Sequence, residues 1–297
     1  MEKTSHIKTM KKVALHGLTV KSDSEKYLTQ IIDRLNKEGV EIWYTKIFQS
    51  RNSIFIDDTS KLTDELTPDF DAVFSLGGDG TFLETLLWVG KSEVPILGIN
   101  MGRLGFLASI AKEYIKESLY LLFKGNYEIE SRALLSLETD LELFKGKTYA
   151  LNECAILRKD TSAMIMVKCY INDQYLNTYW ADGLMVATPT GSTGYSLSCG
   201  GPLMMPDSKD FIITPVSPHN LNVRPLIVSD DSELRFEIES RNRSFLISLD
   251  SRSETVEKDV HIVVKKAPFQ AKLIRIEGIN FPDTIRNKLG WGFDKRN

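Results

Sequence analysis

Hydrophobic and polar residues follow a helical spacing in one part of the chain and an alternating spacing in another. In the first third, short apolar runs occupy residues 12–17, 41–45, 71–76 and 95–100. Between them, apolar residues recur at helical spacing, as at Leu28, Ile31 and Leu35. A polar stretch at residues 49–68 is expected to be a loop. This order of strands and helices predicts a parallel sheet with helices on both faces.

The pattern changes after residue 110. A helix is expected at residues 112–123, and period-two alternation follows, most clearly at Leu234, Phe236 and Ile238. Further short strands are expected at residues 133–140, 150–157, 163–171, 244–250, 260–265 and 271–276. We therefore predict an α/β domain with a parallel sheet and flanking helices at residues 1–108, followed by an all-β, sandwich-like domain at residues 109–276.

The strongest candidate for chemistry is the run Gly77-Gly78-Asp79-Gly80-Thr81, where a predicted buried strand ends and a helix begins. Glycines let the backbone turn tightly, and the free amides at a helix N-terminus attract an anion such as phosphate. Asp79 could accept a proton from a hydroxyl nucleophile or arrange Mg²⁺ beside phosphates. The alternative is a plain tight turn in which Asp79 caps the helix.

A second candidate is the stretch from Asp182 to Pro202, which is rich in glycine, serine and threonine and follows a short apolar strand. It offers many amide and hydroxyl groups with little bulk, and Tyr195 adds a flat surface for a ring. The stretch could wrap around a ligand that carries ribose and phosphate, or it could be a flexible turn. Asn152 and Glu153 interrupt an apolar strand, so they are either hydrogen-bonded structure or a clamp for ribose hydroxyls.

Composition and charge narrow the class of protein. The 297 residues are 42% hydrophobic and 26% charged, which suits one large or two ordinary packed domains. The formal net charge of −3 argues against nucleic acid as the partner. A membrane-spanning helix needs about 18 consecutive apolar residues, and no apolar stretch of this sequence is that long. The first residues also lack the apolar core of a signal peptide. We expect a cytoplasmic protein with no membrane partner, whose three cysteines are reduced thiols.

Two familiar nucleotide motifs are absent. The segment 146–148 resembles the end of a Walker loop, but Leu141 stands where the first glycine of that loop should be. The glycines at positions 98, 102 and 105 lack the spacing of the dinucleotide-binding fingerprint. A hydride-transferring dehydrogenase therefore has no support in this sequence.

Taken together, the motifs resemble the NAD kinase family over residues 12–276. The segment 77–81 is similar to the family's Gly-Gly-Asp-Gly-Thr signature, Asn152-Glu153 to its Asn-Glu pair, and the segment 182–202 to its Asp-Gly and Thr-Pro-Thr-Gly-Ser-Thr motifs. Further matching segments are 98–100, 102–107, 218–219 and 224–225.

The resemblance implies transfer of the γ-phosphoryl group of ATP to the 2′-hydroxyl of the adenosine ribose of NAD, which gives NADP, with Mg²⁺ or another divalent cation accompanying ATP. Asp79 is then the proton acceptor, and Gly77, Gly78, Gly80 and Thr81 form the phosphate loop for ATP. No residue is singled out as a metal ligand. The implied NAD contacts are Asp79, Gly80, Asn152, Glu153, Asp182, Thr190, Thr193, Gly194, Tyr195, Ser196, Leu197 and Ser198. The family also implies a homodimer or homotetramer and a C-terminal tail, residues 277–297, that completes the first domain.

The sequence departs from the family pattern in two places. Gly194 replaces a frequent alanine, and Asp250-Ser251-Arg252 stands where many relatives have Asp-Gly and a polar residue, so no contact is carried over from that segment. Two other functions stay open, a lipid kinase of the diacylglycerol or sphingoid type that shares the aspartate loop, and a non-catalytic dinucleotide-binding sensor. The segment 190–198 and the Asn152-Glu153 pair favour NAD kinase over the former, and Asp79 favours an enzyme over the latter. NADH as acceptor and inorganic polyphosphate as donor also stay open.

Overall fold

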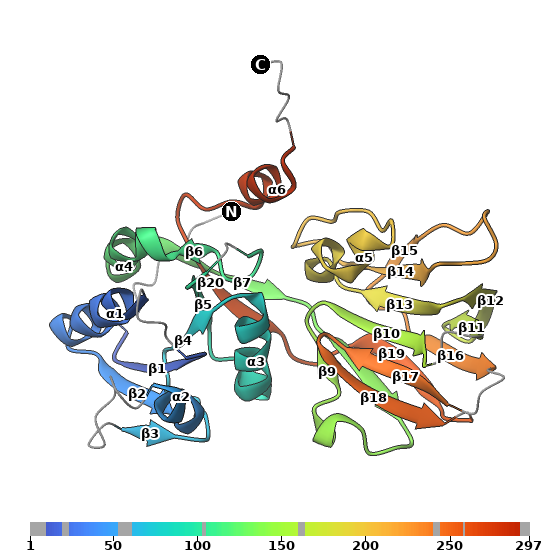
Figure 1. Ribbon diagram of the computed structural model, residues 1–297, viewed down its shortest axis with the longest axis horizontal. Helices are drawn as coiled ribbons and strands as arrows, with labels where there is room; N and C mark the ends of the chain where they lie inside the picture. The colour runs from blue at the N-terminus through green and yellow to red at the C-terminus, as the bar shows by residue number, and fades with distance from the viewer. Residues whose placement is uncertain are drawn as a thin grey trace. The chain divides into compact units, whose positions relative to one another are not determined.

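The computed structural model describes residues 10–19, 24–52, 61–102, 105–159, 164–239, 244–257 and 259–291, and within them the short apolar runs form the strands of three sheets. The chain folds into two compact units (Figure 1). Met1–Ser131 and Ala271–Asn297 form the first unit, and Arg132–Gln270 form the second.

The described part of the first unit contains one sheet of eight strands, in the order β3-β2-β1-β4-β5-β20-β7, with β6 paired to β5. Neighbours from β3 to β5 are parallel, and so are the pairs that β5 forms with β6 and β20. The predicted parallel sheet is therefore confirmed. The strands are β1 (Lys12–Gly17), β2 (Glu41–Thr45), β3 (Leu62–Thr63), β4 (Ala72–Gly77), β5 (Ile96–Asn100), β6 (Ile110–Ala111), β7 (Tyr127–Arg132) and β20 (Ala271–Ile276).

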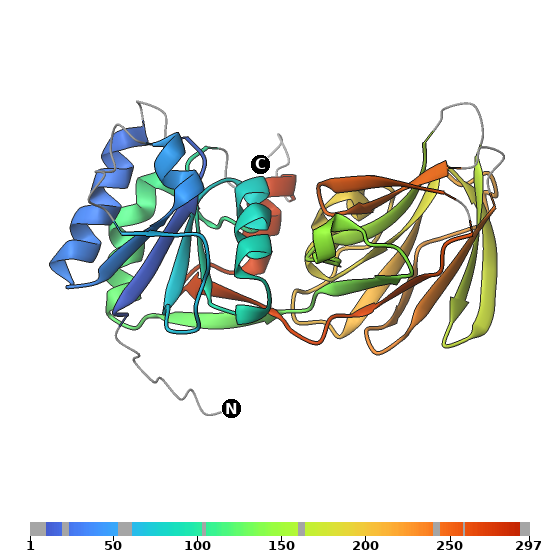
Figure 2. The same cartoon turned by 90° about the horizontal axis from the view of Figure 1, so that it is seen from below.

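Helices cover both faces of this sheet, as Figure 2 shows. Helices α1 and α4 lie side by side, and Leu28, Ile31 and Leu119 from them pack into one core with alternate residues of β1. Helix α3 covers the other face, where its Trp88 ring stacks on His16 at 6.0 Å between ring centroids. The helices are α1 (Glu25–Lys37), α2 (Lys46–Arg51), α3 (Asp79–Val89), α4 (Ile115–Phe123) and α6 (Phe281–Leu289), with short 3-10 turns at Gly90–Ser92 and Lys112–Tyr114.

Two segments that were predicted within the β-rich domain belong to the first unit instead. The expected helix at residues 112–123 contributes α4, which packs on α1. The expected strand at residues 271–276 is β20, which pairs in parallel with β5 and places Leu273 opposite Ile96. Alternation of apolar and polar residues predicts a strand but does not identify its partner, so only the folded chain could assign β20 to this sheet.

The polar stretch at residues 49–68 is not entirely a loop. Its first residues complete α2, whose N-terminus is capped because the Thr45 hydroxyl accepts the amide N–H of Phe48. Its later residues include β3, a two-residue strand that extends the edge of the sheet. Residues 53–60 of this stretch lie outside the described residues.

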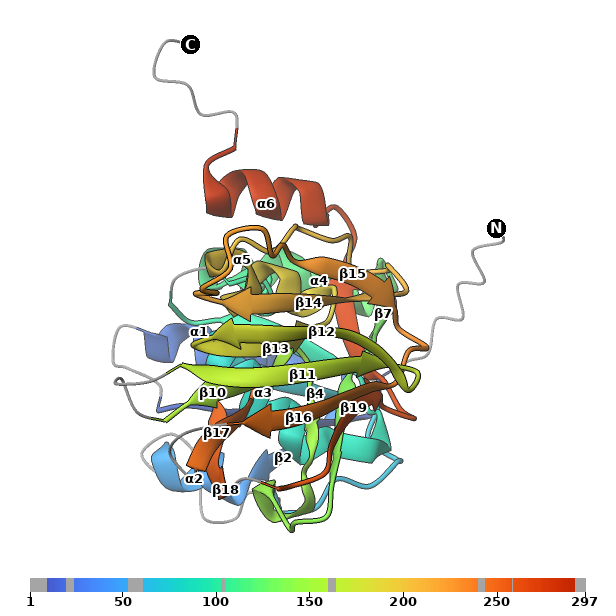
Figure 3. The same cartoon turned by 90° about the vertical axis from the view of Figure 1, so that its right-hand side faces the viewer.

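The described part of the second unit consists of two six-stranded antiparallel sheets, in the orders β15-β14-β13-β10-β17-β18 and β12-β11-β16-β19-β8-β9. Figure 3 shows β11 between its neighbours β12 and β16. The strands are β8 (Leu135–Thr139), β9 (Tyr149–Ala150), β10 (Glu153–Arg158), β11 (Ile165–Ile171), β12 (Gln174–Ala181), β13 (Gly183–Ala187), β14 (Asp210–Val216), β15 (Leu226–Ser229), β16 (Leu234–Glu239), β17 (Ser244–Leu249), β18 (Arg252–Glu257) and β19 (Ile262–Lys266). Short helical turns are η4 (Phe144–Gly146), η5 (Thr190–Thr193) and α5 (Tyr195–Ser198).

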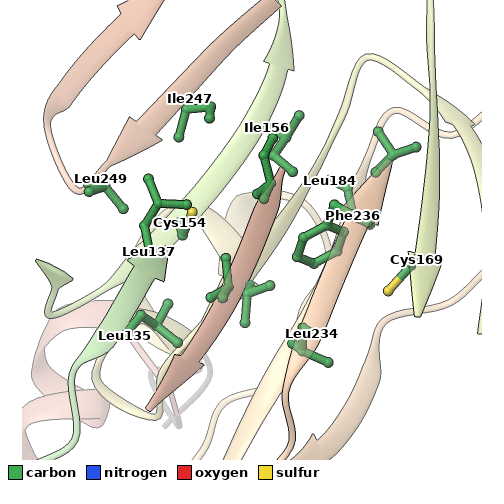
Figure 4. Packing of buried hydrophobic residues seen from close by; sticks show 14 of the residues in the cluster. Leu135, Leu137, Cys154, Ile156, Cys169, Leu184, Leu234, Phe236, Ile247 and Leu249 are labelled. Carbon is green, nitrogen blue, oxygen red and sulfur yellow. The ribbon is translucent and has the colours of Figure 1, made fainter. Parts of the chain in front are cut away.

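One hydrophobic core joins the two sheets of the second unit (Figure 4). Ile156, Leu184 and Ile247 from the first sheet meet residues such as Leu234 and Phe236 from the second. Each fully buried side chain of this size stabilises the fold by about 1.5–3 kcal/mol. The predicted sandwich-like arrangement is confirmed.

The outer face of β14 is also buried, which explains why its sequence shows no alternation. Phe211 to Val216 are all buried, and Ile212 forms a second apolar cluster with Ala187 and Met204. A strand that is covered on both faces has a continuous apolar pattern. The loop after β13, which contains Met204, therefore packs against this face of the sheet.

Candidate active site

The Gly77–Thr81 segment connects the carboxyl end of β4 to the N-terminus of α3, as the sequence predicts. A Cβ on Gly77 would lie 2.2 Å from Thr81 Oγ1, so only glycine fits at that position. Gly78 and Gly80 differ, because no heavy atom of the described residues beyond the local chain lies within 4 Å of where their Cβ would be. This open space, beside the free amides of a helix N-terminus, suits an anionic ligand.

The Asp79 carboxylate accepts hydrogen bonds from the loop that follows β5. Its Oδ2 accepts the amide N–H of Phe106 at 2.8 Å, and its Oδ1 accepts the amides of Leu107 and Ala108, each at 3.0 Å. A carboxylate has about four acceptor sites, so one site on Oδ2 is left beyond these three bonds. Asp79 is thus fixed in orientation by this loop, with capacity for one further donor.

Gly105 is a site residue that sequence reasoning did not single out. A Cβ at this position would lie 1.8 Å from Asp79 Oδ1, so any other residue would displace the carboxylate. The loop is anchored at its start, because the buried Asn100 side chain accepts the amide of Gly102 at 2.7 Å. Residues 102–107 match the family pattern in sequence, and that match was the available signal, but it did not show which glycine touches Asp79.

In the second unit, Asn152 and Glu153 lie against the loop that follows β13. The carbonyl oxygen of Asn152 accepts the amide of Thr188 at 2.9 Å, and the Thr188 hydroxyl donates to the carbonyl oxygen of Leu151. A Cβ on Gly191 would lie 2.0 Å from the Asn152 carbonyl oxygen. The two motifs, about 40 residues apart in the sequence, are therefore held together by backbone contacts that require glycine.

The predicted NAD contacts at residues 190–198 fall into two groups. Ser196 is fully buried, and its hydroxyl bonds to the Thr214 hydroxyl at 2.9 Å. Thr190 is also buried and accepts a bond from Arg132 Nη1 at 3.4 Å. The exposed or half-buried members of the segment are Thr193, Gly194, Tyr195, Leu197 and Ser198. The first group holds the loop against the sheet, and the second is accessible to a ligand.

Glu153 is buried at the centre of this arrangement. Its Oε2 has no hydrogen-bond partner among the described residues, and a Cβ on Gly194 would lie 3.2 Å from that oxygen. Burial, with a further contribution from the charge of Asp250, raises the pKa of Glu153 to about 8. At neutral pH the side chain is then largely a neutral acid, which can donate a hydrogen bond to a ligand oxygen.

Asp182 lies between β12 and β13 and forms an ion pair with Arg158, with 3.1 Å between Asp182 Oδ1 and Arg158 Nε. Its backbone is fixed as well, because its amide donates to the carbonyl oxygen of Val216. Burial raises the pKa of the Tyr195 phenol, and the charges of Asp182 and Glu153 contribute to this shift.

Within the described ranges, no group of three or more histidine, cysteine, aspartate and glutamate side chains could hold a metal ion. No described helix is long and apolar enough to cross a membrane. The cysteines Cys154, Cys169 and Cys199 are free thiols, and the first two are buried.

Two family models match the sequence. The model described as the ATP-NAD kinase N-terminal domain matches residues 7–127, and that of the ATP-NAD kinase C-terminal domain matches residues 151–276. The chain is 46% identical to the NAD kinase of Cytophaga hutchinsonii over 96% of this chain and 99% of that protein. It is 40% identical to the NAD kinase of Christiangramia forsetii over 96% of this chain and all of that protein.

Solved structures share the fold. An NAD kinase from Archaeoglobus fulgidus in complex with ATP aligns with a TM-score of 0.71 and 26% identity, covering 94% of this chain and 97% of that one. The yeast NADH kinase complexed with NADH aligns with a TM-score of 0.83 over 96% of this chain and 89% of that one, at 22% identity. With both domain models and near full-length relatives in agreement, the chain belongs to the ATP-NAD kinase family.

Proposed function

We propose that this NAD kinase transfers the γ-phosphoryl group of ATP to the 2′-hydroxyl of the adenosine ribose of NAD, with Asp79 as the residue that accepts the hydroxyl proton. The observation that carries the role of Asp79 is its bonding pattern. Three backbone amides fix the carboxylate at the N-terminus of α3, and one acceptor site on Oδ2 is left for a substrate hydroxyl.

The ribose 2′-oxygen forms a bond to the γ-phosphorus, the bond from that phosphorus to the bridging oxygen of ADP breaks, and the hydroxyl proton passes to Asp79. A carboxylate is a weak base toward an alcohol, so the proton moves late, as the oxygen–phosphorus bond forms. Positioning and charge neutralisation supply most of the rate enhancement in such transfers.

The donor phosphates are proposed to lie at Gly77, Gly78, Gly80 and Thr81. The open space beside Gly78 and Gly80 supports this assignment, because ligand phosphates could approach the backbone amides there. Mg²⁺ in kinase sites usually keeps several waters and is bound by substrate phosphates with one or two carboxylates. Since the described residues contain no preformed cluster of ligands, Mg²⁺ fits this protein as part of the ATP complex, where it would neutralise phosphate charge.

The NAD contacts are proposed to be Asp79, Gly80, Asn152, Glu153, Asp182, Thr190, Thr193, Gly194, Tyr195, Ser196, Leu197 and Ser198. Glu153 supports this most directly, since an unpartnered buried acid oxygen needs a hydrogen-bond partner that a ribose hydroxyl could supply. Ser196 is the exception in this set, because its buried hydroxyl already bonds to Thr214, and its proposed role is to hold the segment in place. A cytoplasmic homodimer or homotetramer remains part of the proposal.

The test is a purified-enzyme assay that follows NADP formation from NAD and ATP, with Asp79→Asn as the variant. An asparagine amide cannot accept the hydroxyl proton, so turnover should fall by roughly 100-fold or more, the loss expected for a positioned acid–base group. The matched control is Asp33→Asn, which changes an exposed carboxylate on α1 and should keep normal turnover. Near-normal turnover in Asp79→Asn would refute the role of Asp79, whereas absence of NADP with the unaltered enzyme would refute the activity.

A further inference from the structure

Asp250 lies in the turn between β17 and β18 and bonds to the segment that carries Asn152 and Glu153. Its Oδ2 accepts the amide of Leu151 at 3.0 Å, and its Oδ1 accepts the amides of Asn152 at 2.7 Å and Glu153 at 3.3 Å. In the opposite direction, the Asp250 amide donates to the carbonyl oxygen of Glu153 at 3.0 Å. Four hydrogen bonds therefore join one turn residue to three consecutive residues of the candidate site.

Arg252, the first residue of β18, makes two further bonds to the residues that precede Leu151. Its Nη1 donates to the carbonyl oxygen of Lys147 and its Nη2 to that of Tyr149, both at 2.6 Å. Asp250 itself has a φ of 53°, in the left-handed region that aspartate and asparagine tolerate better than most residues. Asp250 thus bonds to the backbone of residues 151–153, and Arg252 to the backbone of the residues before them.

We propose that Asp250 is a positioning residue of the NAD site, which clamps the backbone from Leu151 to Glu153 so that the Asn152 and Glu153 side chains are held toward the ribose. Asp250 acts through these two residues and does not itself contact NAD. The inference rests on the NAD contacts proposed above for Asn152 and Glu153.

The clamp also has an electrostatic consequence. Burial raises the pKa of both carboxyl groups, but at Asp250 three amide bonds and the charge of Arg252 oppose that shift, while Glu153 Oε2 has no partner among the described residues. An ionised carboxylate accepts hydrogen bonds only, so the amides favour the charged form of Asp250. When the pair holds one proton, that proton lies on Glu153, and Asp250 keeps its neighbour a neutral donor.

Other titrating groups face Glu153 as well. Burial raises the pKa of the Cys154 thiol to about 12, and it raises the pKa values of the Cys199 thiol and the Tyr195 phenol above their ordinary values. The charge of Asp182, just before β13, also raises the pKa of Tyr195, and the charge of Arg252 lowers the pKa of Asp250. Because the two thiols and the phenol titrate at higher pH than Glu153, a pH series around 8 reports on the pair of Glu153 and Asp250.

The experiment is steady-state kinetics of Asp250→Asn from pH 6 to 9, with NAD varied at saturating ATP. Asparagine retains the size and the left-handed backbone of Asp250 but presents a donor to one of the amides. The KM for NAD should rise roughly 10-fold while kcat changes less than about 2-fold, as expected for the loss of a charge-assisted bond that orients the substrate site. Asp231→Asn, in an exposed turn of the same unit, is the matched control and should behave as the unaltered enzyme.

The pH profile separates this role from simple destabilisation. In the unaltered enzyme, the KM for NAD should rise as the pH passes about 8, because ionised Glu153 no longer donates. Removing the charge of Asp250 should move this rise to lower pH, and Glu153→Gln should abolish it. An unchanged KM in Asp250→Asn, or an unchanged midpoint, would overturn the proposal.

Two further variants keep the result interpretable. If Asp250→Asn cannot be purified folded, Asp250→Glu takes its place, because it keeps the charge but moves the carboxylate off the three amides, and a normal KM for NAD in that variant would overturn the proposal. If Asn152→Ala and Glu153→Gln leave the saturation curves of an active enzyme unchanged, the NAD contacts themselves are wrong, and Asp250 loses its role with them. If Asn152→Ala raises KM but Asp250→Asn does not, the clamp alone fails.

Discussion

The two units use the same device, an aspartate that accepts three backbone amides, in opposite ways. In the first unit, Asp79 carries the proposed chemistry, and the amides from Phe106 to Ala108 orient it. In the second unit, the amides belong to Leu151 and to the proposed NAD contacts Asn152 and Glu153, and Asp250 accepts them. The same bonding pattern therefore occurs once with the proposed catalytic carboxylate and once with the proposed positioning carboxylate.

The number of bonds to a carboxylate does not decide its role, because Asp79 and Asp250 each accept three amides and each keep one acceptor site on Oδ2. The surroundings of the two side chains differ instead. Asp79 keeps one acceptor site on Oδ2, and its neighbours Gly78 and Gly80 leave open space for a ligand. Asp250 engages both oxygens and its own amide with the segment that it holds. Beside Asp250, the Oε2 atom of Glu153 has no hydrogen-bond partner among the described residues, so Glu153 is the residue of this pair that is proposed to bond to a ligand.

The largest effect is expected from a substitution that displaces the Asp79 carboxylate from its three amides while Asp79 itself is kept. Gly105→Ala would place a Cβ 1.8 Å from Asp79 Oδ1, so the carboxylate must move out of its amides. We expect kcat to fall roughly 100-fold, as for loss of a positioned acid–base group. Gly102→Ala is the control in the same loop, because the nearest atom to its Cβ among the described residues, apart from its chain neighbours, would be Asn100 Oδ1 at 3.8 Å, and its kcat should stay within about 2-fold of normal.

If Gly105→Ala and Gly102→Ala show equal turnover, the orientation of Asp79 by this loop does not matter for catalysis. Circular dichroism and thermal unfolding of both variants would show whether a loss of activity reflects loss of the fold.

A smaller effect is expected from a substitution that separates the Asn152-Glu153 pair from the loop after β13. Gly191→Ala would bring a Cβ within 2.0 Å of the Asn152 carbonyl oxygen, so the loop or the Asn152 backbone must shift. We expect the KM for NAD to rise about 10-fold, the size of one lost hydrogen bond at most sites, with a smaller change in kcat. Gly194→Ala offers a graded comparison, since its Cβ would approach Glu153 Oε2 only to 3.2 Å and the KM should rise less.

The Gly191→Ala result would count against the proposed NAD contacts if substrate saturation stayed normal while thermal unfolding showed that the loop had been disturbed.

The smallest effect is expected in stability against pH. The pKa of Glu153 in the folded protein, about 8, lies above its ordinary value near 4.5, so the folded state binds the extra proton between these values. Stability from this group is present below the ordinary value and is lost as pH rises through about 8. Glu153→Gln should remove this part of the pH dependence and raise the melting temperature at pH 9 by a few degrees relative to the unaltered protein.

The control for this measurement is Glu142→Gln, which alters an exposed carboxyl of the second unit and should leave the pH dependence in place. A Glu153→Gln protein whose melting temperature follows the same pH curve as the unaltered one would show that Glu153 is ionised in the folded state at neutral pH.

The sequence predicted the candidate site better than it predicted the contacts within it. Periodicity located the strand before Gly77 and the helix after it, since both depend on local spacing. It did not show that Gly105 touches Asp79, because that contact joins residues 26 positions apart through a loop. Likewise, Asp250-Ser251-Arg252 stood out only as a departure from the family pattern, yet Asp250 bonds directly to the amides of Asn152 and Glu153, and Arg252 bonds to the carbonyl oxygens of Lys147 and Tyr149 before them.

Periodicity and motifs were enough to predict the fold class and the family and to select two segments as the candidate site, because apolar periodicity and glycine-rich motifs are local properties of the chain. The folded chain was needed to show that β20 joins the first sheet and that the Ser196 hydroxyl is buried against Thr214. It was also needed to show which backbone amides bond to the Asp79 and Asp250 carboxylates. These outcomes depend on pairings between distant residues, on burial and on the number of donors that reach each oxygen, and none of them is fixed by the identity of a residue and its neighbours in the sequence.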